Sequence, residues 1–217
     1  FLYETTVGAG LPIITTLKDL RETGDDVEKV EGMVSGTLAW LFSEYNAEVP
    51  FSQLVLEAKR LGYTEPDPRD DLSGMDVARK TVILARELGY KVEVSDIEIQ
   101  SLVPARFAAL SKEEFLGRIG EMDAEIEEMY KKARSHNMCL RYVGKVDHGI
   151  CSVSLSEYPM DHSFAQANGT DNVIAFTTKR YHNQPLVVKG PGAGPEVTAA
   201  GVFSDILRLS AYLGSKI

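Results

Sequence analysis

The sequence predicts an α+β fold in which helices cover a mixed, largely antiparallel sheet. Segments with helical spacing of apolar residues alternate with strand-like segments in the first two thirds of the chain. Four further strand candidates then follow one another before a last helix. With 44% hydrophobic and 25% charged residues, the 217-residue chain has enough apolar material for a core.

The N-terminal third is expected to contain short helices around one strand. The first residues, FLYETT, read as a strand fragment leading into a glycine loop, an unusual start that suggests a piece of a longer protein. The spacing of apolar residues and the positions of proline and glycine then predict a helix over 12–22, a strand over 26–34, and helices over 38–45 and 50–62.

The middle of the chain contains the clearest helix, expected over 73–88 after a polar loop at 64–72. Ser73 followed three residues later by Asp76 fits a capping box at its start. Alternating apolar residues predict a strand over 92–99, and helical spacing predicts one long helix over 111–135 with a charged, solvated face.

The last third reads as a sheet followed by a helix. Turn residues separate four strand candidates, at 139–146, 150–158, 172–178 and 185–190. A glycine loop then opens a final helix.

The charge balance and the apolar pattern exclude some partners. A net charge of −9 repels phosphate backbones, so we expect no nucleic-acid partner. No apolar run is long enough to span a membrane, and no signal peptide is visible. Cys139 and Cys151 lie in separate strand candidates, which favours a reducing, intracellular compartment.

The segment 65–71 is the densest group of charges, with four carboxylates, one arginine and two prolines. We expect the prolines to prevent a helix here and to stiffen a loop. Such a loop could bind an ammonium group or a hard divalent cation, although its spacing does not match a calcium loop. An exposed acidic turn that caps the next helix explains the same residues equally well.

Asp76 and Lys80 are four residues apart and therefore share one helix face. On an exposed helix they would form an ordinary ion pair worth about 0.3–0.5 kcal/mol. If the pair faces a cleft, the lysine could instead donate a proton to an oxygen that gains negative charge, while the aspartate orients it.

Glycines precede several predicted helices. The patterns at 7–10 and 192–194 follow strand-like segments but lack the third glycine of a dinucleotide fingerprint, so no complete dinucleotide-binding domain is expected. The sequence Ser35, Gly36, Thr37 could offer free N–H groups to a carboxylate or could simply cap its helix. The four histidines show no ligand spacing.

Several motifs together resemble the catalytic and dimerisation part of homoserine dehydrogenases, from end to end of the chain. The resemblance rests on YETTVGAGLPII (3–14), VEGMVSGTL (30–38), GYTEPDPRDDLSGMDVARK (62–80), SDIEI (95–99), LRYVG (140–144) and GPGAGPEVTAAGVFSDILR (190–208). The family's N-terminal dinucleotide-binding domain is absent from the sequence. The C-terminal sequence is similar to that of homoserine dehydrogenases fused behind an aspartokinase. A fused aspartokinase would therefore be a possible partner domain.

The resemblance implies NAD(P)H-dependent reduction of L-aspartate 4-semialdehyde to L-homoserine, in threonine, methionine and isoleucine biosynthesis. Lys80 would donate the proton, Asp76 would hold the substrate or its attendant water, and Glu65 would bind the substrate ammonium. The remaining implied substrate-binding residues are Asp70, Asp71, Tyr63, Gly36 and Thr37.

The resemblance also implies two non-protein groups. A monovalent cation, sodium, would be bound by Glu4 and by the carbonyls of Val7, Ala9 and Leu11. Gly194 would approach the nicotinamide side of NADP or NAD.

The implied organisation is a catalytic, substrate-binding and dimerisation domain over 1–189, which would form a homodimer through its sheet. The glycine loop and helix of 190–217 would pack back toward the missing nucleotide-binding domain. The protein would be cytoplasmic, or plastidic if it comes from a plant. Two alternatives stay open: a non-catalytic dimerisation fragment, and a divalent-metal hydrolase built on the 65–71 carboxylates.

Overall fold

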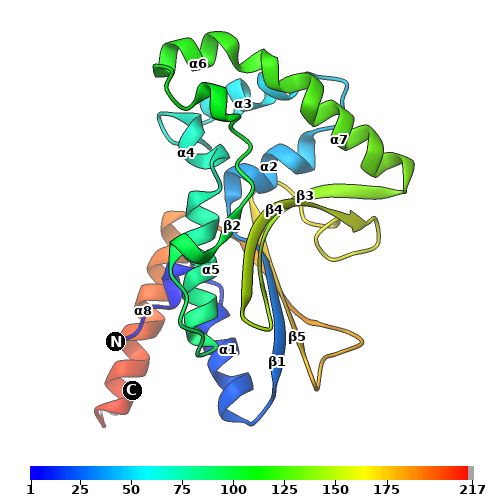
Figure 1. Ribbon diagram of the computed structural model, residues 1–217. Helices are drawn as coiled ribbons and strands as arrows, with labels where there is room; N and C mark the ends of the chain where they lie inside the picture. The colour runs from blue at the N-terminus through cyan, green and yellow to red at the C-terminus, as the bar shows by residue number, and fades with distance from the viewer. Residues whose placement is uncertain (215–217) are drawn as a thin grey trace.

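A computed structural model describes residues 1–214 and contains one open six-stranded sheet (Figure 1). The strand order is β2-β4-β3-β1-β5-β6, and all pairs are antiparallel except β2 with β4. The strands are β1 (Val27–Met33), β2 (Glu98–Ile99), β3 (Met138–Asp147), β4 (Ile150–Pro159), β5 (Asp171–Thr178) and β6 (Leu186–Pro191). This mixed, largely antiparallel sheet confirms the predicted α+β class.

The helices form two groups around the sheet. Helices α1, α5 and α8 run along one side of it, whereas α2, α3, α4, α6 and α7 gather at one end (Figure 1). Their bounds are α1 (Ile13–Glu22), α2 (Gly36–Glu44), α3 (Phe51–Arg60), α4 (Pro68–Leu72), α5 (Met75–Glu87), α6 (Lys112–Arg118), α7 (Asp123–Ser135) and α8 (Pro195–Tyr212). None of the helices within residues 1–214 combines the length and apolar character needed to cross a membrane.

Alternation along the central strands sends side chains to two separate clusters. Val30 of β1 and Ile174 of β5 belong to the main core, which is shared with α1, α2 and α5. Met33 and Val173 point to the other face, where Phe164 and its loop cover a smaller cluster. The predicted strands 26–34, 139–146, 150–158, 172–178 and 185–190 are therefore confirmed to within a residue or two.

The strand expected at the N-terminus is wrong. Residues Glu4–Thr6 form a short 3₁₀ helix, and the Glu4 carboxylate is buried at the start of α1. There it accepts hydrogen bonds from the main-chain N–H groups of Ile14, at 2.7 Å, and Thr15, at 3.1 Å. The first N–H groups of a helix have no partner inside it, so the Glu4 carboxylate satisfies two of them and stabilises the start of α1.

The expectation of a helix-free loop at 64–72 is also wrong. Pro68 starts the short helix α4, and Asp67 caps it by accepting from the Arg69 N–H at 3.0 Å. Proline suits the first helical position, because its missing N–H would have had no partner there.

The capping box of Ser73 and Asp76 does not form. Gly74 precedes α5 with a φ of 74°, and no side chain caps that helix end. Ser73 instead ends α4, and its hydroxyl accepts from the Met75 N–H at 3.2 Å. A turn of two residues between two helices leaves no extended residue at the capping position.

The predicted strand at 92–99 reduces to the two residues of β2. A 3₁₀ turn over Val94–Asp96 interrupts it, because Asp96 bonds back to the main-chain N–H of Glu93. The local side-chain bond outweighs the apolar alternation.

The long helix expected at 111–135 is divided into α6 and α7 by a 3₁₀ segment at Ile119–Met122. The break brings Asp123 to the start of α3. There its carboxylate accepts from the N–H and the hydroxyl of Ser52, both at 2.7 Å.

Candidate active site

The candidate site lies where β1 runs into α2. Ser35 takes the extended capping conformation, and its hydroxyl oxygen accepts from the Leu38 N–H at 3.3 Å, so the plain capping role is confirmed. Gly36 is the first helical residue, and a side chain there would meet Thr170 at 3.4 Å. The helix start is therefore packed closely against the segment that leads into β5.

Lys80 of α5 points toward this helix start. Its ammonium group donates to the Val34 carbonyl at 2.7 Å and pairs with the Asp76 carboxylate at 2.8 Å. The Lys80 side chain is only 22% exposed, whereas that of Asp76 is 56% exposed. The predicted ion pair is confirmed, and the lysine is largely shielded instead of extending into solvent.

Asp71 of α4 links the helix start to the acidic segment. One carboxylate oxygen lies 2.8 Å from the Thr37 hydroxyl, and the other accepts from the Glu65 N–H at 2.8 Å. Burial raises the pKa of Asp71 above its usual range, and the hydrogen bonds from Glu65 and Thr37 oppose that rise. The Thr37 hydroxyl also lies 2.5 Å from the Tyr63 carbonyl.

The structure therefore joins most of the predicted substrate residues through one network. Gly36, Thr37, Asp71 and the main chain of Glu65 are bonded or adjacent in it. The Glu65 and Asp70 side chains are exposed at its edge. Tyr63 is 42% exposed and packs edge-on against Trp40, with ring centroids 5.5 Å apart.

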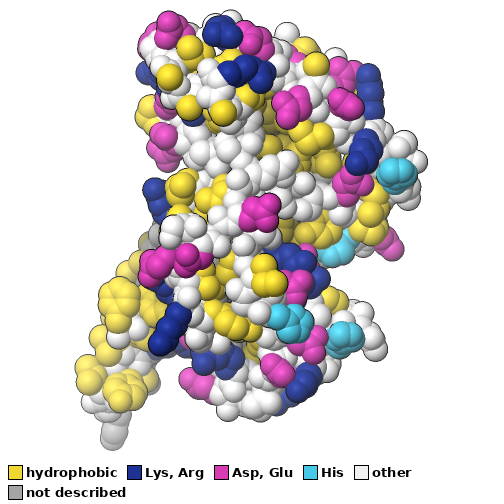
Figure 2. All heavy atoms as spheres, in the orientation of Figure 1, with side chains coloured by type: hydrophobic (Ala, Val, Ile, Leu, Met, Phe, Trp, Pro, Cys, Tyr) yellow, Lys and Arg dark blue, Asp and Glu magenta, His cyan; other side chains and the backbone are white. Residues whose placement is uncertain are grey.

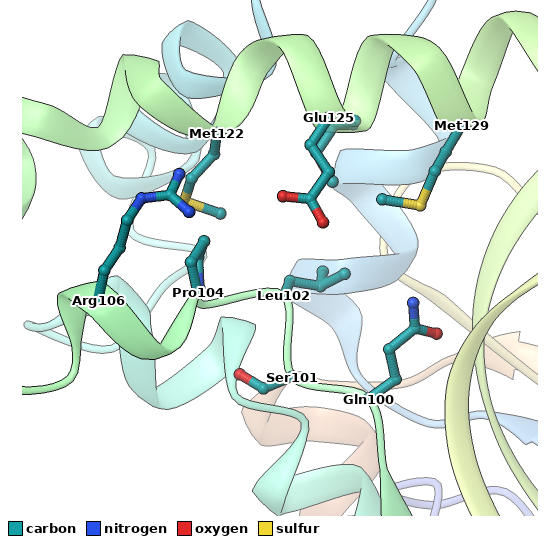
Figure 3. A pocket seen from close by; sticks show the side chains of 9 residues that line it. Gln100, Ser101, Leu102, Pro104, Arg106, Met122, Glu125 and Met129 are labelled. Carbon is teal, nitrogen blue, oxygen red and sulfur yellow. The ribbon is translucent and has the colours of Figure 1, made fainter.

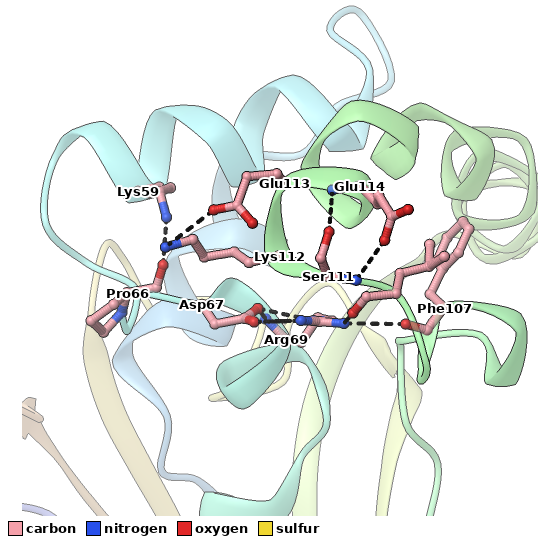
Figure 4. A network of polar contacts seen from close by, with 10 residues as sticks. Lys59, Pro66, Asp67, Arg69, Phe107, Ser111, Lys112, Glu113 and Glu114 are labelled. Atoms are coloured by element: carbon pink, nitrogen blue, oxygen red, sulfur yellow. Dashed lines mark hydrogen bonds and ion pairs between the residues drawn. The ribbon is translucent and has the colours of Figure 1, made fainter.

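The remaining charges of segment 65–71 fix its shape (Figure 4). Arg69 pairs with Asp67 at 2.6 Å and donates to the carbonyl of Leu110 at 2.7 Å. Lys59 donates to the Pro66 carbonyl at 2.5 Å. Hydrogen bonding to Arg69 lowers the pKa of Asp67, so that carboxylate has a structural partner within the loop.

No metal-binding cluster is present in the part of the chain that the structure describes. Within residues 1–214, no three His, Cys, Asp or Glu side chains are arranged to hold a metal ion. The divalent-metal hydrolase considered from the sequence therefore has no geometric support in the 65–71 segment.

The two glycine loops meet at α8, which the sequence did not indicate. A side chain at Gly10 would lie 2.1 Å from the Val197 carbonyl, and one at Gly201 would lie 2.5 Å from Thr5. Close approach of the helix to the N-terminal loop therefore requires glycine at both positions. Gly194 precedes the helix with a φ of 127°, and a side chain there would meet only Val197, at 3.6 Å.

The N-terminal loop carries the four residues assigned to a cation. The Glu4 carboxylate is 3% exposed and, besides its bonds to α1, pairs with Arg208 at 3.1 Å. Ala9 has a φ of 53°, which turns the loop sharply between the carbonyls of Val7 and Leu11. Sequence reasoning missed Arg208, since nothing marks it as a partner of a residue some two hundred positions away.

A surface cavity lies apart from this network. A cavity of 190 Å³ lies between residues 100–106 and α7, with Glu125 pointing into it beside Met122 and Met129 (Figure 3). None of the predicted site residues lines it. The candidate site is instead the network of Thr37, Asp71 and Lys80, to which α2, α4 and α5 each contribute one residue. We call this network the Lys80 corner.

A shielded lysine and several carboxylates therefore gather at a helix start on an α+β sheet. In a comparison with known families, residues 12–207 match the family described as homoserine dehydrogenase. The chain belongs to the homoserine dehydrogenase family.

Individual relatives span nearly all of the chain. It is 54% identical over 218 residues to a chloroplastic bifunctional aspartokinase/homoserine dehydrogenase of Arabidopsis thaliana, covering 99% of this chain and 24% of that protein. It is 47% identical to the homoserine dehydrogenase of Saccharomyces cerevisiae, covering 98% and 62%. The chain therefore spans less than two thirds of either relative.

Solved structures share the fold. A Candida auris protein of unknown function superposes with a TM-score of 0.91 at 47% identity, covering 96% of this chain and 60% of that one. A hyperthermophilic archaeal homoserine dehydrogenase in complex with NADPH superposes with a TM-score of 0.70 at 25% identity, covering 99% and 56%.

Proposed function

We propose that this chain is the catalytic and substrate-binding part of a homoserine dehydrogenase that reduces L-aspartate 4-semialdehyde to L-homoserine. The observation that carries the proposal is the shielded Lys80, held between Asp76 and the start of α2 in a chain of this family. A nicotinamide cofactor, NADP or NAD, would supply the hydride when bound, as the NADPH complex of the archaeal relative supports.

In this proposal Lys80 is the proton donor. Its ammonium group already has one carbonyl and one carboxylate partner, which leaves one donor free for the aldehyde oxygen. As negative charge develops on that oxygen, a positioned ammonium stabilises it and transfers a proton. Asp76 would orient the lysine and hold the substrate or its water.

The polar corner beside Lys80 would bind the amino-acid end of the substrate. The exposed Glu65 carboxylate would take the ammonium group, with Asp70, Asp71 and Tyr63 completing the wall. Gly36 and Thr37, in the first turn of α2, would meet the substrate carboxylate at the positive end of the helix dipole.

Two further groups are proposed at the glycine loops. Glu4 and the carbonyls of Val7, Ala9 and Leu11 have the oxygen-donor chemistry of a site for sodium or another monovalent cation, which would share Glu4 with Arg208. Gly194, which precedes α8, would lie at the nicotinamide side of the cofactor.

The greater length of the relatives supports a proposed domain organisation. We assign residues 1–189 to catalysis, substrate binding and a homodimer through the sheet, and 190–217 to contact with a nucleotide-binding domain. Apolar side chains gather over α8 and the N-terminal residues, as expected for a face that another domain covers (Figure 2). Residues 215–217 lie outside the described residues.

The parent protein would be an isolated dehydrogenase or one fused to an aspartokinase, as in the plant relative. Its location would be intracellular: cytoplasmic, or plastidic if the protein comes from a plant. A non-catalytic dimerisation fragment is less favoured. Dimerisation alone would not require a shielded lysine that lies beside several carboxylates.

The test is the effect of Lys80→Ala on the full-length gene product. Turnover should fall by a factor of about 10²–10⁴, the usual contribution of a positioned general acid. Replacing the exposed Lys91 with alanine is the matched control and should leave turnover unchanged. Wild-type turnover in the Lys80 variant would remove the lysine from catalysis.

A further inference from the structure

Asn172 of β5 is buried without hydrogen bonds. Its residue is 1% exposed, and neither Oδ1 nor Nδ2 has a hydrogen-bond partner. Among residues 1–214, these are the only buried side-chain polar atoms in that condition. Buried polar groups in folded proteins are nearly always paired, so an unpaired amide requires an explanation.

The position of Asn172 connects two parts of the proposed site. Its strand lies between β1, which runs into α2, and β6, whose last two residues, 190 and 191, begin the glycine loop 190–194. Asn172 pairs with Gly190, while the next residue, Val173, pairs with Met33. The amide therefore lies between the Lys80 corner and the loop that contains Gly194.

The amide group packs directly against Gly192. A side chain at that position would lie 2.2 Å from Oδ1 and 2.7 Å from Nδ2 of Asn172. Glycine is thus required at 192 as long as asparagine occupies 172. Packing alone would be served equally well by leucine, which has the same branched shape and no polar atoms to bury.

We infer that Asn172 is a positioning residue for the glycine loop 190–194, and this inference rests on the proposed function. With cofactor bound, a small shift of the loop lets the Asn172 amide donate to one loop carbonyl and accept from one loop N–H. The loop is then fixed against the nicotinamide side. The glycines at 190, 192 and 194 give its main chain the freedom that this shift requires.

The test compares Asn172→Leu with the wild type in the full-length gene product. Leucine removes the unpaired amide, so the thermal midpoint should stay constant or rise in the absence of cofactor. The dissociation constant for NADPH should increase at least tenfold, while turnover at saturating cofactor changes less. Asn183→Leu, in an exposed loop, is the control and should change neither quantity.

A second pair of variants keeps the test valid if leucine does not fit. Gly192→Ala should lower the thermal midpoint, and adding Asn172→Ala should restore it by removing the clash. The double variant should still bind NADPH at least tenfold more weakly. Wild-type NADPH affinity in either Asn172→Leu or the double variant would overturn the inference, whereas a wild type that does not bind NADPH would instead contradict the proposed function.

Discussion

Asp71 is kept charged in surroundings that disfavour charge. It is half-buried, and hydrogen bonds, the largest from Glu65 and Thr37, offset part of the loss of hydration. Asparagine has nearly the same shape as aspartate and carries no charge, so it would avoid the cost of burying a charged group at this position. The carboxylate is explained if the corner binds a cationic group, as the proposed substrate ammonium requires.

Asp71→Asn should change the pH dependence of stability. Because the folded-state pKa of Asp71 is raised, its contribution to stability is present below the unfolded pKa of about 3.9 and is lost as pH rises through the folded pKa. The variant lacks this loss. Its thermal midpoint relative to wild type should therefore be higher at pH 7 than at pH 3.5.

Thermal unfolding of both proteins across that pH range checks the prediction. Glu128→Gln, an exposed change on α7, should give a parallel curve. A constant difference between wild type and Asp71→Asn at every pH would contradict the raised pKa.

Glu65→Gln should separate substrate binding from chemistry. If the Glu65 carboxylate meets the substrate ammonium, its loss raises the KM for the amino-acid substrate about tenfold or more, with a smaller effect on turnover. Steady-state kinetics on the full-length gene product measure both. An effect confined to cofactor affinity would refute the assignment.

At the scale of elements, local sequence patterns predicted most strands and the helices α1, α2, α3 and α5 to within about two residues, but they missed α4 and the break between α6 and α7. The strands from β3 to β6 have regular alternation and turn residues between them, so their positions follow from local sequence. The break between α6 and α7 depends on Asp123 reaching α3, a contact between residues seventy-one positions apart. No periodicity signals that contact.

The candidate site was predictable to a similar extent. Ion pairing of Asp76 with Lys80 follows from helix geometry alone. The residue roles came from the resemblance of 62–80 to a family motif, not from periodicity. Arg208 and Asn172 gave no signal, because each acquires its surroundings from segments that are distant in sequence.

Asp123 should matter to α3 more than to its own helix. Pro50, which precedes α3, has no side-chain acceptor, so Asp123 supplies the missing cap from α7. Asp123→Ala should reduce the free energy of unfolding by about 1–2 kcal/mol. Denaturant titration measures this, and Glu125→Ala on the same helix should cost far less.

Gly74 and Gly62 provide a matched pair for testing the turn before α5. Both have a φ close to 75°, but a side chain at Gly74 would lie 2.0 Å from the Tyr142 hydroxyl, while nothing lies within 4 Å at Gly62. Gly62→Ala should cost about 1–2 kcal/mol from conformation alone. Gly74→Ala should cost roughly 1–3 kcal/mol more, because of overpacking. Equal losses would mean that Tyr142 moves aside freely.

At the scale of the whole molecule, α8 leaves much of its apolar surface uncovered, and Gly201 is its one buried residue. Val202, Ile206 and Leu209 are about half exposed and line an apolar groove of 370 Å³ with Phe1 and Leu2. Soluble proteins rarely leave such a surface open. The nucleotide-binding domain proposed above would cover it.

Ile206→Glu should therefore act differently in two forms of the protein. In the 217-residue chain it should leave the thermal midpoint nearly unchanged, since the side chain is exposed. In the full-length gene product it should lower the midpoint and weaken NADPH binding. Leu61→Glu, an exposed leucine on another surface, is the control. No difference between the two forms would mean that α8 stays uncovered.

The central place of β1 in the sheet affects when the chain can fold during its synthesis. Its partners are β3, which begins at Met138, and β5, which ends at Thr178, so β1 must wait for most of the polypeptide to be synthesised. Pairings between such distant segments form slowly and leave nascent apolar segments open to aggregation. We therefore expect newly made chains to need chaperone protection until β5 emerges.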